Sequence, residues 1–166
     1  EQIVSAEEVW NGRWQLAATD DKKRTLLHIA SRFGSAGCVR LLLDEGAKVD
    51  AEERYGATPL LFACEAGQLE CAQLLIAHGA LPQADSIRCG YGQRNDSEDP
   101  HDVFTTGETC LLVACRTACP ELVRLLLSSG SSIFEELEDG SSPYHHLCKL
   151  SPGRPISAAL ALSLIH

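Results

Sequence analysis

Aromatic residues are scarce in this sequence. Phe, Tyr and Trp make up 5% of its 166 residues, whereas hydrophobic residues as a whole make up 45% and charged residues 22%. The core must therefore be built from aliphatic side chains, which favours helices over aromatic-rich strands. The same composition argues against wholesale disorder, because it provides enough apolar surface for one compact domain. We expect an all-α protein.

Positive charge is also in short supply. Lys and Arg number 14 against 23 Asp and Glu, a formal net charge of -9. Such a chain is repelled by nucleic acids and anionic membranes, so we expect no nucleic-acid partner. The longest apolar run, ISAALALSLI, is half as long as a membrane span of about 20 residues. Because the chain also starts without a basic region leading into an apolar segment, we expect an intracellular protein, cytoplasmic or nuclear, with no membrane insertion.

Familiar catalytic motifs are missing as well. The sequence has no Gly-rich phosphate loop followed by Lys, no G-x-S-x-G and no H-E-x-x-H. We therefore expect no enzyme activity, no catalytic residues, no cofactor and no small-molecule substrate. Nucleophilic chemistry by Cys and His is the alternative, since the chain has eight cysteines and six histidines.

A 33-residue internal repeat is the strongest pattern in the chain. The strings TLLHIASRFG, TPLLFACEAG, TCLLVACRTA and SPYHHLCKLS begin at Thr25, Thr58, Thr109 and Ser142. Thr58 follows Thr25 by 33 residues and Ser142 follows Thr109 by 33, whereas 51 residues separate Thr58 from Thr109. One register holds throughout if 18 residues are inserted between the second and third units.

Each unit has the punctuation of a helix pair. Thr58 and Pro59 make a good helix start, Gly67 separates two helices, and Gly79 ends the second helix. The pattern T-P-L-x-x-A, then Gly, then LLx-x-x-G-A at this period resembles the ankyrin repeat over about residues 20 to 150. The resemblance implies helix pairs and short β-hairpin fingers, stacked into a solenoid with a concave face of fingers and inner helices. It also implies a non-catalytic module that binds other proteins.

The register divides the chain into two parts. Residues 1–24 are expected to form an N-terminal capping helix and the first finger, and residues 25–166 the ankyrin-repeat domain. The repeats begin at residues 25, 58, 109 and 142, with an inserted loop within residues 81–108 and an incomplete last repeat.

The capping helix is expected from a local signal. Ser5 and Glu8 have the spacing of a capping box, in which each side chain satisfies a backbone N–H of the first helical turn. We expect Trp10 and Trp14 to pack against the first unit.

The register also assigns positions to the cysteines. Cys64, Cys115 and Cys148 lie six residues after a cap residue, and Cys38 and Cys71 lie thirteen after one. Recurrence at the same step of each repeat places these side chains in small helix-facing niches, where a free Cys packs as a small hydrophobe. We therefore favour packing over reactivity for these thiols.

Zinc binding is the alternative for the thiols. Spacings near those of zinc ligands occur among Cys110, Cys115 and Cys119 and among His145, His146 and Cys148. We expect no metal site, because Cys115 occupies a niche shared by unrelated units and the four ligands of a structural zinc must converge. Cys89, inside the insertion, has no repeated counterpart and is the thiol expected to react.

Two histidines have a role implied by the resemblance. His28 and His145 each lie three residues after the cap residue. In ankyrin repeats a His at this place bonds the Thr hydroxyl and neighbouring backbone, so the resemblance implies a structural role for both rings.

The remaining exposed positions of the inner helices, fingers and insertion are the candidate contacts for a partner protein. They are Arg32, Phe33, Glu52, Glu53, Arg54, Tyr55, Glu65, Arg94, Asp96, Glu98, Asp99, Arg116 and Thr117. The insertion is acidic, so a basic peptide segment is one candidate partner; a tolerated surface loop without contacts is the alternative. We expect the isolated domain to be monomeric.

A second function is implied by the string ACEAGQLECAQLLIAHGA, residues 63–80, which has a Cys in both helices. It resembles ankyrin-repeat and SOCS-box proteins, the substrate-recognition subunits of cullin-type ubiquitin ligases, which bind elongin and cullin through a C-terminal box. This chain contains no such box.

Overall fold

The computed structural model describes residues 16–82, 109–117 and 119–131. Six helices lie in these ranges: α3 (Leu26–Arg32), α4 (Ala36–Asp44), α5 (Pro59–Glu65), α6 (Leu69–Ala77), α7 (Cys110–Arg116) and α8 (Pro120–Ser128). None of these helices has the length and apolar composition needed to cross a membrane.

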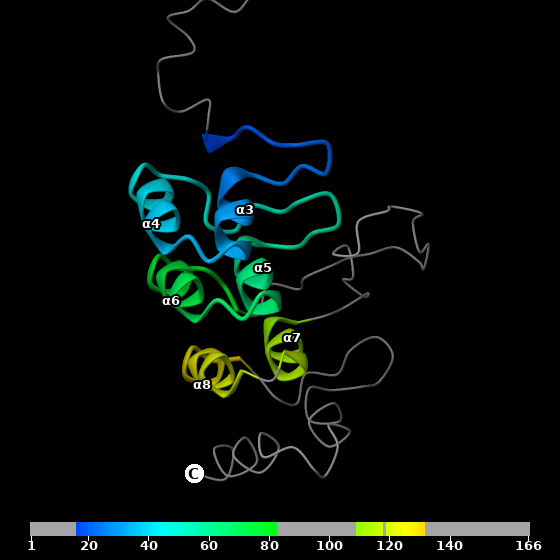
Figure 1. The fold of residues 1–166 in the computed structure, drawn as a ribbon, viewed down its shortest axis with the longest axis vertical. Helices are drawn as coiled ribbons and strands as arrows, with labels where there is room; N and C mark the ends of the chain where they lie inside the picture. Colours follow the sequence, from blue (N-terminus) through cyan, green and yellow to red (C-terminus); the bar gives the residue numbers. More distant parts are fainter. Residues whose placement is uncertain (1–15, 83–108, 118, 132–166) are drawn as a thin grey trace, which may run out of the picture.

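The helices are stacked as three pairs. Helices α3, α5 and α7 form an inner row, and α4, α6 and α8 form an outer row (Figure 1). Each inner helix contacts the next inner helix and its own outer partner, and each outer helix contacts the next outer helix. The prediction of an all-α solenoid of helix pairs is therefore confirmed.

The inner helices begin as their sequences predict. The Thr58 hydroxyl oxygen accepts a hydrogen bond from the Leu61 N–H at 3.4 Å, and that of Thr109 accepts from the Leu112 N–H at 3.2 Å. Pro59 is the first helical residue of α5, where the missing N–H has no intrahelical acceptor to leave unpaired.

Glycines end the helices of the second unit. Gly67 and Gly79 have φ angles of 69° and 90°, in the left-handed region that L side chains avoid. After α6 the Ala80 N–H donates to the Leu75 carbonyl at 2.9 Å, which satisfies a carbonyl of the last turn. Both glycines have the roles predicted from the sequence.

The core repeats from unit to unit. The fully buried side chains include Leu60, Ala63 and Cys64 of α5, Cys71 of α6, Val113, Ala114 and Cys115 of α7, and Leu122 of α8. The small alanines and thiols let the inner helices contact one another directly. The packing role predicted for Cys64, Cys71 and Cys115 is confirmed.

The first unit differs at the side chains that face away from the second unit. Exposed fractions are 46% for Leu26 and 37% for Ile29. The residues that match Leu26 and Ile29 in the second unit, Pro59 and Phe62, are buried. A preceding layer covers these positions in the second and third units, and no described helix covers them in the first.

Cys38 was wrongly predicted to occupy a helix-facing niche. It is exposed, although Cys71 and Leu122 at the matching step of the next units are fully buried. The reason is its place at the start of the described stack, because this step of the repeat is covered by the unit before.

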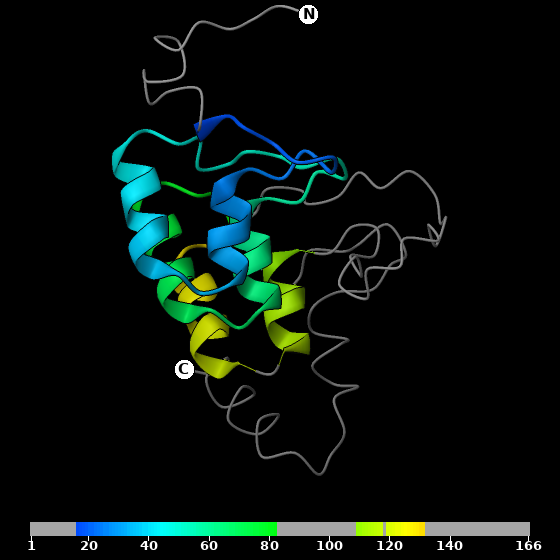
Figure 2. The ribbon, with the colours of Figure 1, turned by 45° about the horizontal axis from the view of Figure 1, so that its top comes forward.

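The fingers lie on the side of the inner helices. The first finger, residues 17–24, and the second, residues 47–57, run side by side (Figures 1 and 2). The sequence predicted β-hairpins here. In the described ranges only one antiparallel bridge forms, between Thr19 and Thr25, so these fingers are turns rather than strands.

Three predicted features lie outside the described residues. They are most of the capping segment, the insertion and the repeat from Ser142. The division at residues 24 and 25 and the capping helix stay predictions.

Tryptophan fluorescence can test the capping segment, because Trp10 and Trp14 are the only two tryptophans. If they cover the exposed face of the first unit, Leu26→Glu will shift their emission to longer wavelength, since a buried charge is costly and would displace them. Leu81→Glu is the matched control, because Leu81 is 61% exposed at another place in the stack. Equal spectra for both variants would contradict the prediction.

Candidate partner-binding surface

One row of side chains runs along the ends of the inner helices. Arg32, Glu65 and Arg116 each lie seven residues after a helix cap, so their charges alternate along the row. Arg116 is exposed, and Arg32 and Glu65 are half-buried. Phe33, next to Arg32, is the most exposed large hydrophobic side chain of the described residues, at 75%. The row therefore combines charge with one exposed aromatic ring.

The four predicted contact residues of the second finger differ in their exposure to solvent. Glu53 is 7% exposed, and its Oε1 accepts from the Tyr55 N–H at 2.7 Å and the Ala57 N–H at 3.2 Å. Its carboxylate holds the turn instead of facing a partner, which corrects its prediction as a surface contact. Tyr55 is half-buried and packs against the core, whereas Glu52 and Arg54 are exposed.

Thr117 is tied to the stack. Its hydroxyl donates to the Ala114 carbonyl at 3.1 Å and reaches the Cys64 carbonyl of the preceding unit at 3.5 Å. The side chain is half-buried, so it links α7 to α5 at the border of the candidate surface.

Six of the described candidate residues remain after Glu53, Tyr55 and Thr117 are set aside, and we call them the inner surface. Its members are Arg32, Phe33, Glu52, Arg54, Glu65 and Arg116. The four candidates of the insertion, Arg94, Asp96, Glu98 and Asp99, lie outside the described residues, and their role stays a prediction.

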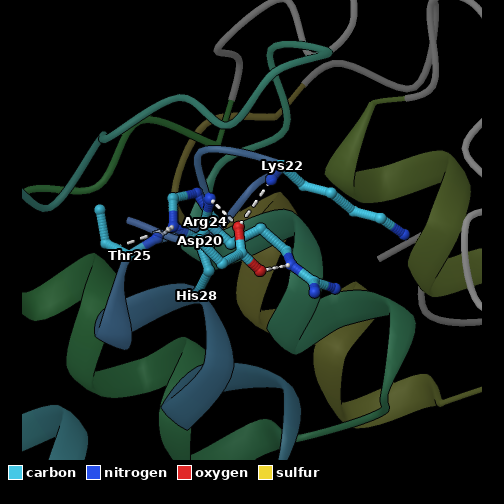
Figure 3. A network of polar contacts seen from close by, with 5 residues as sticks. All are labelled: Asp20, Lys22, Arg24, Thr25 and His28. Atoms are coloured by element: carbon cyan, nitrogen blue, oxygen red, sulfur yellow. Dashed lines mark hydrogen bonds and ion pairs between the residues drawn. The ribbon is translucent and has the colours of Figure 1, made fainter. Parts of the chain in front are cut away.

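Asp20 organises the first finger and was missed by the sequence reasoning. Its Oδ1 accepts from the Lys22 N–H at 3.0 Å and the Arg24 N–H at 2.8 Å, and its Oδ2 from Arg24 Nε at 2.7 Å (Figure 3). Partial burial acts to raise the pKa of Asp20, but the Arg24 hydrogen bonds and charge hold it below its ordinary value. The missed signal is register, since Asp20 and Glu53 each precede a cap residue by five.

His28 joins the first two units. Its Nδ1 lies 3.0 Å from the Thr25 backbone nitrogen, an N–H donor, and 2.9 Å from Oγ1 of the same residue (Figure 3). Its Nε2 lies 3.1 Å from the Ala57 carbonyl oxygen, so the ring donates there. The ring meets Phe62 edge to face, with centroids 5.4 Å apart. These contacts confirm the structural role that the resemblance implied.

Burial makes the thiols of the stack poor nucleophiles. It raises the pKa of Cys115 to about 12, and with a smaller effect of Glu70 it also raises the pKa of Cys71. Cys119 is half-buried and Cys38 exposed, while Cys89 lies outside the described ranges. Within those ranges, no three His, Cys, Asp or Glu side chains are grouped so as to hold a metal ion.

The fold and this surface define a helical repeat protein, and comparison with known proteins identifies its family. The family model "Ankyrin repeats (3 copies)" matches residues 10–86, and "Ankyrin repeat" matches residues 106–136. The chain belongs to the ankyrin-repeat family. Repeats of this family are in general non-catalytic modules for protein–protein interaction.

Similar proteins are functionally diverse. The transient receptor potential cation channel subfamily A member 1 homolog of Caenorhabditis elegans is 29% identical over 134 residues, which is 81% of this chain and 10% of that protein. Ankyrin repeat and SOCS box protein 11 of Danio rerio is 31% identical over 117 residues, 70% of this chain and 33% of that protein. B-cell lymphoma 3 protein of Homo sapiens is 31% identical over 136 residues, 81% of this chain and 27% of that protein. The chain thus spans a third or less of the length of these relatives.

The buried ring of His28 predicts a pH-dependent stability. Burial lowers the pKa of His28 below 6.5, although its hydrogen bond to the Ala57 carbonyl acts in the opposite direction. As the pH falls below 6.5, the unfolded chain takes up a proton that the folded ring resists, so the free energy of unfolding falls. One such group contributes a slope of at most about 1.4 kcal/mol per pH unit.

Urea unfolding at several pH values measures this slope. His28→Leu, which introduces the residue type of Leu61 and Leu112 at the matching steps, is expected to flatten the slope between pH 6.5 and the lower, folded-state pKa. His78→Gln is the control, because His78 is exposed on the same stack. Equal slopes for the wild-type chain and His28→Leu would refute the assignment.

Proposed function

We propose that this chain binds a partner protein through the inner surface, the finger tips and the insertion. The observation that carries the proposal is the exposed Phe33 ring beside Arg32, in the row that continues to Arg116. Aromatic rings and arginines contribute most to binding energy in protein interfaces. The side chains at the recurring positions of the repeat, in contrast, are buried between the helices of the stack.

Charge distribution supports a basic segment as the ligand of the insertion. The described residues contain 9 Lys and Arg against 10 Asp and Glu, a charge of -1, whereas the whole chain carries -9. Most of the negative charge therefore belongs to the segments outside the described stack, which include the insertion. Complementary charge raises the association rate and excludes acidic competitors.

Affinity capture followed by quantitative mass spectrometry tests the proposal. Phe33→Ala is expected to reduce recovery of specific partners by roughly tenfold or more, as for a central aromatic contact. Leu41→Ala is the matched control, because Leu41 is also a largely exposed apolar residue but lies on the outer helix α4. Equal recovery with both variants would reject the inner surface as the binding site.

The same measurement can include a variant that lacks residues 86–103. Loss of basic partners with this variant supports the contribution of the insertion. Unchanged recovery identifies it as a surface loop without contacts, while leaving the test of Phe33 independent.

Substrate recognition for a cullin-type ubiquitin ligase is the second candidate. It is favoured by the similarity to Ankyrin repeat and SOCS box protein 11 and by the buried Cys64 and Cys71, one on each helix of the second unit. If it holds, the full-length gene product will co-purify with elongin and cullin. Absence of both proteins from that complex would eliminate this candidate and leave protein binding by the inner surface unaffected.

A further inference from the structure

The turns of the two described fingers meet at one edge of the stack. The Arg54 N–H of the second finger donates to the Lys22 carbonyl of the first at 2.9 Å, so the two turns are joined through their backbones. The same fingers lie side by side in Figures 1 and 2. Lys23 and Arg54 are exposed and Lys22 is half-buried. We call these three residues the basic edge.

The backbone of the basic edge is held in one shape. The Asp20 carbonyl accepts from the Lys23 N–H at 2.8 Å, and the Asp20 carboxylate accepts from the N–H groups of Lys22 and Arg24. In Figure 3 the Lys22 side chain extends away from this carboxylate, which pairs with the Arg24 side chain instead. Because the turn is fixed before a ligand arrives, binding there costs little backbone entropy.

The positive charge of the basic edge is not used inside the stack. Among the described residues, neither the Lys23 nor the Arg54 side chain has a carboxylate within ion-pair distance. The carboxylates of Asp20, Asp50 and Glu53 in the same fingers accept hydrogen bonds from backbone N–H groups. These acids therefore have partners of their own, and the charges of Lys23 and Arg54 face solvent.

The two sides of the stack carry net charges of opposite sign. The fingers and the inner helices α3, α5 and α7 contain 7 Lys and Arg against 6 Asp and Glu, a charge of +1. The rest of the described chain contains 2 Lys and Arg against 4 Asp and Glu, a charge of -2. An acidic ligand is thus directed to the finger side and away from the outer helices.

The net charge of -9 for the whole chain does not prevent this attraction. At physiological salt the Debye length is about 8 Å, so exposed charges farther away than this are largely screened. A ligand that touches the basic edge therefore responds mainly to the charges of the edge itself.

We infer that the basic edge binds an acidic segment of the partner protein, with Lys23 and Arg54 as the side chains that contact its carboxylates. The inference deepens the proposed function and rests on it. It assigns a second, oppositely charged part of the partner to the fingers, beside the basic segment proposed for the insertion. Charge complementarity at both places would fix the direction in which the partner lies along the stack.

The composition of the fingers favours a peptide over a nucleic acid. Asp21, next to Lys22, and Glu52, two residues before Arg54, are exposed acids that interrupt the positive charge. A duplex has one negative charge per ~1.7 Å of its axis and cannot avoid them. A peptide can place carboxylates opposite Lys23 and Arg54 and other residues opposite the two acids.

Fluorescence anisotropy with labelled octaglutamate tests the inference on the full chain. At about 0.15 M salt the chain is expected to bind octaglutamate and not octaglutamine, and the affinity is expected to fall as salt is added. No binding of octaglutamate would overturn the inference. Single-stranded DNA that binds as tightly, and at the same residues, would assign the edge to nucleic acid and also overturn it.

Matched double variants make the test specific. Lys23→Glu with Arg54→Glu is expected to weaken octaglutamate binding by roughly tenfold or more, because like charges then face the ligand. Arg40→Glu with Arg124→Glu is the control, since it makes the same change in net charge at exposed positions of α4 and α8 and must retain binding. Lys23→Arg with Arg54→Lys, which keeps the charge of the edge, must also retain it. An equal loss in the first two variants would overturn the inference.

A variant that lacks residues 86–103 tests the competing occupant. If octaglutamate binds this variant but not the full chain, the edge is occupied by the acidic insertion of the same chain, and a partner segment is rejected. Equal affinity for both chains supports a partner segment.

Affinity capture separates this inference from the proposed function. Loss of the Phe33-dependent partners with Lys23→Glu and Arg54→Glu, but not with the control pair, supports the acidic segment. Partners that depend on Phe33 and are recovered equally with both double variants reject the acidic segment and leave binding by the inner surface intact.

Discussion

Direct contact between successive inner helices is the constraint on which the rest of the stack depends. One helix pair cannot bury its own apolar face, so each unit is completed by the next. Ala63 and Ala114, at the same step of the repeat, are fully buried and small enough for α3, α5 and α7 to pack against one another. The spacing of the fingers and of the row of charged side chains follows from this contact.

The connection between units can be polar or apolar at one and the same step. In the first unit His28 bonds Thr25 on one side and the Ala57 carbonyl on the other. In the next two units Leu61 and Leu112 stand in its place and are buried among the core side chains. The first arrangement fixes the ring by directed bonds, whereas the second depends on shape and apolar area alone. The same backbone geometry therefore tolerates two different chemistries.

Much of the fold could be predicted from the sequence, because a repeat shows the residue type at the same structural position in several units. Helix starts at Thr58 and Thr109 and the burial of Cys64 follow from register. Register does not show which unit comes first in the described stack, so it failed for the exposed Cys38. It was also insufficient for Glu53, since the sequence cannot show a carboxylate folding back onto its own turn. The candidate surface is the part least determined by the sequence, because the repeat register does not specify which residue types stand at its exposed positions.

The turn of each described finger is held by one acidic side chain that lies five residues before the helix cap. Asp20 binds the backbone N–H groups of Lys22 and Arg24, and Glu53 binds those of Tyr55 and Ala57. These bonds end on backbone nitrogen, although in the first finger the Arg24 side chain also donates from Nε to Asp20 Oδ2 at 2.7 Å. Lys23 even keeps a φ angle of 60° without being glycine. Mutation of exposed side chains in these fingers can therefore leave the shape of the loop intact, so the contacts that we propose for the finger tips can change without a change of fold.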